Sequence, residues 1–315
     1  MLKTAECVSP SHPDKLCDRI SDAVLDAYLT QDPNSRVAVE AVGSHGKIFV
    51  TGEVTSKAHD IDICAIVEII VGDKYDISVH VVEQSPEIAQ GVDTGGAGDQ
   101  GIMTGYATRE TDTYMPKEYE LARSLCQALY AQYPYDGKTQ VTLDDQGTIH
   151  SVVASFQNAP TAELLALVES VIPGAQAYHV NPAGDWSVGG FDADAGLTGR
   201  KIIVDNYGPE IAVGGGAFSG KDPSKVDRSG AYMARRVAVD YLEKYPDAQT
   251  VLVKLAYAIG HPEALMAVAI VDGVSEDIEG YDLTPNGIKS FLQLDTPVYG
   301  DTAQWGHFGR GFAWK

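Results

Sequence analysis

The chain has 315 residues, of which 44% are hydrophobic and 21% charged, an ordinary composition for a globular protein that excludes a disordered or collagen-like one. Its 23 Lys and Arg residues stand against 44 Asp and Glu residues. The formal net charge of −21 argues against nucleic acid or an anionic membrane as a partner, because their phosphates would be repelled. An anionic substrate would have to meet a local concentration of positive charge.

Periodic apolar residues predict one series of elements three times along the chain. The first series is a helix over 14–29, strands over 36–42 and 47–54, a helix near 58–71 and a strand over 76–82. The second is a helix near 116–132, strands over 140–143 and 148–156, a helix over 161–171 and a strand over 176–180. The third is a helix over 224–245, strands over 250–258 and 265–271, and a helix near 285–294. The predicted fold class is α+β, with three pseudo-symmetric repeats of helix-strand-strand-helix-strand whose sheets pack together; ordinary α+β alternation is the alternative reading.

Three segments rich in glycine and charge lie outside these series, over 83–106, 181–220 and 302–315, and there we expect binding groups. Within the first of them, residues 95–101 are too rich in glycine for the interior of a helix or strand, and fit either a lid or a tight turn. The chain shows no targeting pattern and no membrane span, which predicts a cytoplasmic protein. The four cysteines show no metal-ligand spacing and are expected to be reduced and mostly buried.

One motif matches part of a phosphate-binding pattern. Residues 215–221, Gly-Gly-Ala-Phe-Ser-Gly-Lys, fit G-x-x-x-x-G-K, but Asp222 replaces the Ser or Thr whose hydroxyl a P-loop places on magnesium. Glycines and the start of the following helix would still suit an anion, with Lys221, Lys225 and Arg228 along one side. A solvated basic helix face is the alternative.

Positive charge is concentrated around this motif. Residues 197–236 carry a net charge of +3 within the acidic chain, as a polyphosphate site would require. The seven basic residues are Arg200, Lys201, Lys221, Lys225, Arg228, Arg235 and Arg236. A second potential anion site is the start of the first helix, where His12 could donate to a phosphate oxygen and Asp14 could bind Mg²⁺. An ordinary helix N-terminus with an acidic first turn would show the same residues.

Together these motifs resemble the S-adenosylmethionine synthetase family. The matching stretches are residues 12–15 and 20–23, 96–101, 194–201, 214–228 and 306–310, in the same order as in the family. The resemblance implies that ATP, L-methionine and water give S-adenosylmethionine, phosphate and diphosphate: the methionine sulfur attacks C5′ of ATP and expels the triphosphate, which is then hydrolysed. It also implies three similar domains, over 1–90, 99–186 and 188–315 and interlocked in space, and active sites between the subunits of a homodimer or a dimer of dimers.

The resemblance further implies roles for individual residues. The expected ATP contacts are His12, Asp136, Lys138, Trp186, Asp194, Arg200, Lys201, Ala217 and Lys221. The expected methionine contacts are Glu53, Gln90, Asp99, Asp194, Lys225 and Ile259. Asp14 and Asp227 would be ligands of Mg²⁺, two ions per site, and Glu40 would serve a K⁺ site. His12, Lys138, Arg200, Lys221 and Lys225 are the expected catalytic residues.

The sequence departs from the family pattern in two respects. Gln90 and Gly98 are close together, so the gating loop is shorter than usual, which suggests broader tolerance of S-alkyl homocysteines. Asp185-Trp186 stands where the family commonly has a basic residue and an aromatic one; Trp186 could still stack on adenine, but Asp185 cannot replace the positive charge. A catalytically silent nucleotide-binding member of the same fold, and a P-loop-like ATPase or kinase, are the alternatives.

Overall fold

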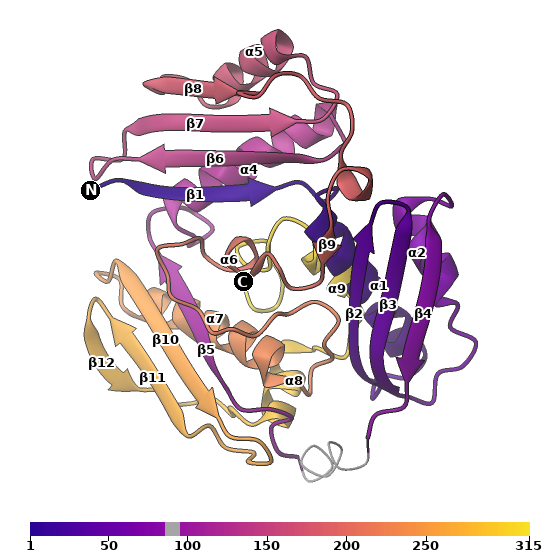
Figure 1. Ribbon diagram of the computed structural model, residues 1–315. Helices are drawn as coiled ribbons and strands as arrows, with labels where there is room; N and C mark the ends of the chain where they lie inside the picture. The colour runs from indigo at the N-terminus through magenta and orange to yellow at the C-terminus, as the bar shows by residue number, and fades with distance from the viewer. Residues whose placement is uncertain (86–94) are drawn as a thin grey trace.

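Three four-stranded sheets surround a common centre. The computed structural model describes residues 1–85 and 95–315, and Figure 1 shows the sheets from their open side. The first sheet contains β2 (Arg36–Ser44), β3 (Lys47–Thr55), β4 (Asp76–Val82) and the short β9 (Gly196–Leu197), in the order β4-β3-β2-β9. The expected α+β fold with three similar units is confirmed.

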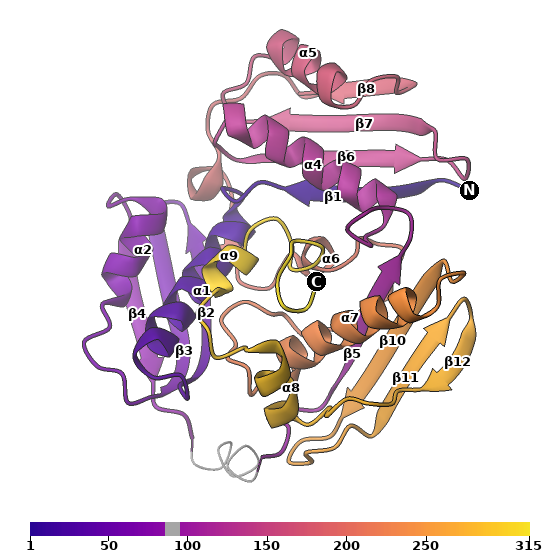
Figure 2. The same ribbon diagram turned by 180° about the vertical axis from the view of Figure 1, so that it is seen from behind.

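The first unit buries one face of its sheet against helices. Val37, Val39 and Ala41 of β2 are buried, as the alternation along a half-buried strand requires. They pack toward α1 (Pro13–Gln31), and α2 (Ile63–Val71) covers the same face, seen in front in Figure 2. The helix expected from about residue 58 begins later, because the Asp62 side chain accepts from the Ala65 N–H and caps α2 there.

The other two units have the same plan. The central sheet, in the order β1-β6-β7-β8, contains β1 (Lys3–Val8), β6 (Gly137–Leu143), β7 (Ile149–Phe156) and β8 (Ala177–Val180), with α4 (Lys117–Gln132) and α5 (Thr161–Val171). The third sheet, in the order β12-β11-β10-β5, contains β5 (Gly101–Thr108), β10 (Thr250–Tyr257), β11 (Met266–Val271) and β12 (Val274–Asp277), with α7 (Val226–Lys244) and α8 (Pro285–Leu292).

Each sheet includes one strand that comes from a distant part of the chain. β1 pairs with β6, β5 pairs with β10, and β9 pairs with β2, all antiparallel. These three strands and β12 were not predicted from the sequence. The third series ends with α8 close to the predicted helix, and the unpredicted β12 lies between β11 and that helix. Strands added from a distance carry no local repeat signal.

The C-terminal residues lie in the centre of the molecule, between the three units, as Figures 1 and 2 both show. They follow the short helix α9 (Tyr299–Thr302), and His307, Phe308 and Trp314 are buried. Arg123 of α4 donates to the Phe308 carbonyl at 2.6 Å, and Arg235 of α7 donates to the Lys315 carbonyl at 3.2 Å. The tail therefore joins the central and third units.

In the described part of the chain, no helix is long and apolar enough to cross a membrane. All four cysteines are free thiols, and Cys7, Cys17 and Cys126 are buried as expected, whereas Cys64 is exposed.

Candidate functional site

His12 caps the N-terminus of α1 and is held in its neutral form. Its Nδ1 accepts a hydrogen bond from the Asp14 N–H at 3.2 Å, which leaves the ring proton on Nε2. Burial, followed by repulsion from Lys201 and Lys138, lowers the pKa of His12 to about 3. The imidazole is therefore a neutral Nε2–H donor at the positive end of a helix, an arrangement that suits a phosphate oxygen.

Asp14 joins α1 to a segment almost 190 residues further along the chain. Its Oδ1 accepts from the Leu197 N–H at 3.0 Å, and its Oδ2 accepts from the Lys201 Nζ at 2.5 Å. Arg200 Nε lies 3.5 Å from Oδ1. Burial alone would raise the pKa of Asp14, but the hydrogen bonds from Lys201 and Leu197 bring the net shift below its ordinary value. The carboxylate is therefore ionised and buried.

Further predicted residues surround this pair. Asp136, just before β6, accepts from the Gly190 N–H at 3.0 Å, and burial raises its pKa. Lys138 and Asp194 act electrostatically on both His12 and Asp136, which places them in the same neighbourhood. We call this set the His12 group: His12, Asp14, Asp136, Lys138, Asp194, Arg200 and Lys201.

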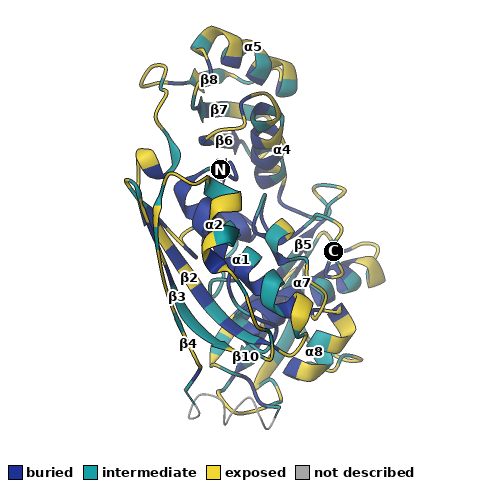
Figure 3. Cartoon of the chain, turned by 90° about the vertical axis from the view of Figure 1, so that its right-hand side faces the viewer, coloured by how far each residue is buried: buried dark blue, intermediate teal, exposed yellow. Residues whose placement is uncertain are grey.

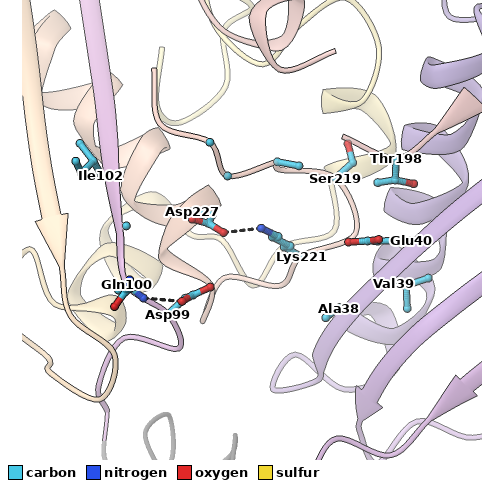
Figure 4. A pocket seen from close by; sticks show the side chains of 14 residues that line it. Ala38, Val39, Glu40, Asp99, Gln100, Ile102, Thr198, Ser219, Lys221 and Asp227 are labelled. Atoms are coloured by element: carbon cyan, nitrogen blue, oxygen red, sulfur yellow. Dashed lines mark hydrogen bonds and ion pairs between the residues drawn. The ribbon is translucent and has the colours of Figure 1, made fainter. Parts of the chain in front are cut away.

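Other predicted residues line a central cavity of about 500 Å³, drawn in Figure 4. Its lining includes Glu40, Asp99, Ala217, Lys221 and Asp227. Lys221 Nζ points toward Asp227 and lies 2.5 Å from its Oδ2, while Glu40 faces the cavity from β2. Carboxylates outnumber the ammonium group on these walls, so the cavity favours positively charged ligand groups or a cation.

Lys221 reaches this cavity because its segment pairs with β2. An isolated bridge joins it to Ala38, and the Val39 N–H donates to the Gly220 carbonyl at 3.0 Å. Glycine at 216 lets the Asp227 side chain approach this segment closely, since a Cβ there would lie 2.4 Å from the Asp227 carboxylate.

Lys225 is placed differently, at the N-cap position of α7. Its Nζ lies 2.5 Å from Asp222 Oδ1, and the same oxygen accepts from the Val37 N–H at 2.8 Å. In the sequence Asp222 stands out only as a departure from the P-loop pattern, which does not predict that it anchors this segment to β2. The P-loop reading itself is wrong, because residues 211–220 contain no strand and α7 begins only at Val226.

The predicted positive island is smaller than the sequence suggested. Arg228 is buried and binds both carboxylate oxygens of Asp22, at 2.7 and 2.8 Å. Arg235 is buried and donates to backbone carbonyls, including that of Thr113 at 2.8 Å, and Arg236 pairs with Asp240. These three arginines hold the fold together and do not face a ligand, which corrects the expectation for them.

Trp186 and Asp185 lie at a separate hollow of about 340 Å³, with Asn158, Pro160 and others. The Trp186 indole N–H donates to Ser155 Oγ at 3.1 Å, which fixes the ring. Asp185 Oδ1 accepts from the Thr161 N–H at 3.0 Å and from its hydroxyl at 2.5 Å. Asp185 therefore caps α5, a function that a basic residue could not perform.

Three predicted residues remain to be placed: Glu53, Ile259 and Gln90. Glu53 of β3 is opposite Ala38, a residue of the cavity wall, but does not itself line the cavity. Ile259 is exposed in the loop after β10, which holds the Ala97 backbone through Gly260 and His261. Gln90 and most of the shortened gating loop lie outside the described residues.

The donor sets at two carboxylates fit Mg²⁺. No group of three or more metal-ligating side chains occurs within residues 1–85 and 95–315. Asp14 and Asp227 are single carboxylates, each beside one lysine. Mg²⁺ is typically bound by one or two carboxylates and completes its shell with water and substrate phosphates. The residues present therefore suit a magnesium ion shared with a polyphosphate.

Three α+β units around a charged, glycine-rich centre form a fold with the features of an enzyme whose substrate is small and charged. Models of the N-terminal, central and C-terminal domains of S-adenosylmethionine synthetase match residues 1–86, 94–186 and 188–315. The S-adenosylmethionine synthase of Leifsonia xyli subsp. xyli is 42% identical over 380 residues, covering 100% of this chain and 95% of that protein. Those of Clostridium tetani and Brachyspira hyodysenteriae are 41% and 40% identical, covering 98% and 99% of this chain and 94% and 95% of their own lengths. The chain belongs to the S-adenosylmethionine synthetase family.

Proposed function

We propose that this chain is a methionine adenosyltransferase, which makes S-adenosylmethionine from ATP and L-methionine and hydrolyses the released triphosphate to phosphate and diphosphate. The observation that carries the proposal for the site is the contact of Asp14 with Lys201 beside a neutral His12. It combines a helix N-terminus, an imidazole donor and lysine cations, the groups that stabilise a highly charged leaving group.

The reaction needs positioning and charge stabilisation and no protein nucleophile, because the methionine sulfur itself attacks C5′. In our proposal the triphosphate lies along the His12 group, where His12 Nε2–H, Lys138, Arg200 and Lys201 donate to it, and Lys221 donates from the central cavity. Asp136, Asp194, Ala217 and Trp186 hold the nucleoside, with the adenine on the fixed Trp186 ring.

The methionine would use the carboxylate-rich side of the site. Its ammonium group suits Asp99, with Asp194 and Glu53 as further contacts in the proposal, and its carboxylate suits Lys225. The family resemblance adds Gln90 as a methionine contact. Ile259 would contact the side chain. The excess of carboxylates over cations on the central cavity wall supports this placement of an ammonium group.

Metal ions complete the proposal. Asp14 and Asp227 would hold two Mg²⁺ ions, whose charge offsets that of the triphosphate when they are bound. Glu40, an oxygen donor on the cavity wall, would serve K⁺. A potassium titration of the wild type and of Glu40→Gln tests the second part: a potassium response that is the same in both would contradict it.

A second copy of the chain would complete the site. The open face of the first sheet, which Figure 3 shows without a helix over it, exposes the apolar side chains Val42, Phe49 and Leu197. The His12 group and the central cavity are also separate features of one chain. We therefore propose a homodimer or a dimer of dimers that pairs through this face. Gel filtration of the wild type and of Phe49→Glu tests it, because the variant should elute later.

The organisation into units over 1–90, 99–186 and 188–315, exchanging strands, and the cytoplasmic location are parts of the same proposal. A fractionation experiment would test the location.

One assay separates the candidate functions. The protein is incubated with ATP, L-methionine, Mg²⁺ and K⁺, and the products are separated by chromatography. A sulfonium product with phosphate and diphosphate supports the proposal. ADP would indicate an ATPase or kinase, and nucleotide binding without turnover would indicate a silent member of the fold.

A further inference from the structure

Helix α1 carries an aspartate on every fourth residue, at positions 14, 18, 22 and 26. This spacing places the four carboxylates along one face, where like charges weaken a helix. Asp14, Asp18 and Asp22 are nevertheless buried, so helix formation alone does not explain them. Each of the four accepts a backbone N–H from a segment far along the chain.

The two middle aspartates hold matching peptides. Asp18 Oδ1 accepts from the Gly199 N–H and Asp22 Oδ1 from the Gly220 N–H, both at 2.8 Å. Both glycines have φ of +79°, which disfavours any other residue. Space is also closed: a Cβ at Gly199 would lie 2.5 Å from the Ala217 Cβ, and one at Gly220 would lie 1.9 Å from the Val39 carbonyl oxygen.

Each of these glycines comes directly before a cation of the proposed triphosphate site. The two tripeptides are Thr198-Gly199-Arg200 and Ser219-Gly220-Lys221, hydroxyl, glycine and cation in the same order. Two successive turns of α1 therefore hold the glycine before Arg200 and the glycine before Lys221.

Both carboxylates face a cation inside the protein. Lys15 Nζ lies 2.9 Å from Asp18 and also donates to Asp205 at 2.6 Å, so Asp18 shares its cation, whereas Arg228 binds Asp22 through two nitrogens. Arg228 also donates to the Lys221 carbonyl at 3.2 Å, so Asp22 and Arg228 together hold the Gly220 N–H and the Lys221 carbonyl. Replacing a buried ion pair by apolar residues is often neutral or stabilising, so stability is a weak reason for these pairs and precise placement a stronger one.

We propose that Asp18 and Asp22 are positioning residues, which fix the backbone of Arg200 and Lys221 so that both cations meet the triphosphate. The inference rests on the proposed function. Asp26 supplies the matched comparison: it accepts from the Tyr299 and Gly300 N–H groups at 3.0 and 2.7 Å, and neither residue precedes a cation of the site.

The test compares Asp18→Asn, Asp22→Asn and Asp26→Asn in the full-length protein. An amide keeps the shape but loses the charge and one acceptor oxygen. We measure the melting temperature, kcat and KM for S-adenosylmethionine formation, and the affinity for inorganic tripolyphosphate with Mg²⁺. Asp18→Asn and Asp22→Asn should lower kcat by about ten- to a hundredfold, the scale of a 1 Å misplacement. They should also weaken tripolyphosphate binding, with a much smaller change in KM for methionine. Asp26→Asn should lower the melting temperature but leave kcat within about twofold.

Two results would overturn the inference: full kcat and tripolyphosphate affinity in Asp18→Asn or Asp22→Asn, or losses in Asp26→Asn as large as theirs. If Asp22→Asn does not fold, Arg228→Lys decides, because lysine keeps the charge but loses the second contact with Asp22 and the bond to the Lys221 carbonyl. It should show the same kcat loss, and full activity would refute the inference. If the wild type forms no S-adenosylmethionine, the proposed function fails, and tripolyphosphate affinity still tests the positioning.

Discussion

Replacement of Lys221 by alanine is the sharpest test of the proposed site. Lys221 Nζ lies 2.5 Å from Asp227, and the walls of the central cavity otherwise present the carboxylates of Glu40, Asp99 and Asp227. The variant therefore removes the ammonium group and leaves three carboxylates facing the space. A triphosphate that approaches this surface loses a donor and meets stronger repulsion.

The size of the effect follows from the geometry. Two unit charges 4 Å apart interact by about 4 kcal/mol at the effective dielectric of a protein surface. Loss of one preorganised donor at a site of developing charge costs about 3–4 kcal/mol, or 10²–10³ in kcat. We expect this loss for Lys221→Ala. The ion pair with Asp227 is partly exposed and contributes at most about 1 kcal/mol to folding, so the melting temperature should fall by only a few degrees.

The assay measures kcat for S-adenosylmethionine formation at saturating ATP and methionine, with circular dichroism to confirm folding. Lys3→Ala is the control, because Lys3 pairs with Glu110 at 3.3 Å on the central unit, away from both groups of site residues. It should retain wild-type kcat. A folded Lys221→Ala protein with kcat within about twofold of the wild type would show that the triphosphate site is wrongly placed.

Three further predictions concern the Mg²⁺ ligand, the residue that stacks on adenine and the stability of the protein at low pH. Asp227→Asn should raise the Mg²⁺ concentration for half-maximal rate by about tenfold or more. The control Asp240→Asn, which breaks the pair with Arg236, should leave this concentration unchanged. Equal Mg²⁺ dependence in the two variants would show that Asp227 does not bind the metal. Trp186→Ala should raise KM for ATP by about tenfold, since stacking on a base contributes about 1–3 kcal/mol, and Trp186→Phe should restore most of it; an unchanged KM for ATP in the alanine variant would place adenine elsewhere. Burial lowers the pKa of His307 well below its ordinary value. Below about pH 6.5 the unfolded chain therefore takes up a proton at His307 that the folded protein does not. The free energy of unfolding should fall as the pH falls, by up to about 1.4 kcal/mol per pH unit. Urea unfolding between pH 7 and 5 should show a smaller loss for His307→Asn, and parallel losses would contradict the assignment.

The regular elements were largely predictable because their signals are local. The apolar alternation of β2 and the helical spacing of α1 appear within a short window of residues, and the structure has both close to the expected bounds. The strands β1, β5 and β9 were missed, because their partners lie elsewhere in the chain and short apolar runs are ambiguous by themselves.

Some residues of the site were likewise predictable from local signals, and others were not. His12 and Asp14 were recognisable from a helix N-terminus, and Lys221 from its glycine-rich surroundings. The role of Arg228 was not, because an arginine that binds Asp22 in the interior has the same sequence signature as one that faces a phosphate. Asp185 was likewise read as a lost positive charge, and only its contact with Thr161 showed that it caps α5.

By itself, the sequence determined the family, the α+β class and the identity of the charged residues, since these depend on residue types and on spacing along the chain. Only the tertiary structure decided which charges face a ligand and which neutralise one another inside. Seven basic residues of one segment look alike in sequence. The fold buries two of them against carboxylate or carbonyl oxygens and leaves Lys221 at a cavity, because a buried charge is tolerated only where a partner from another part of the chain is already in place.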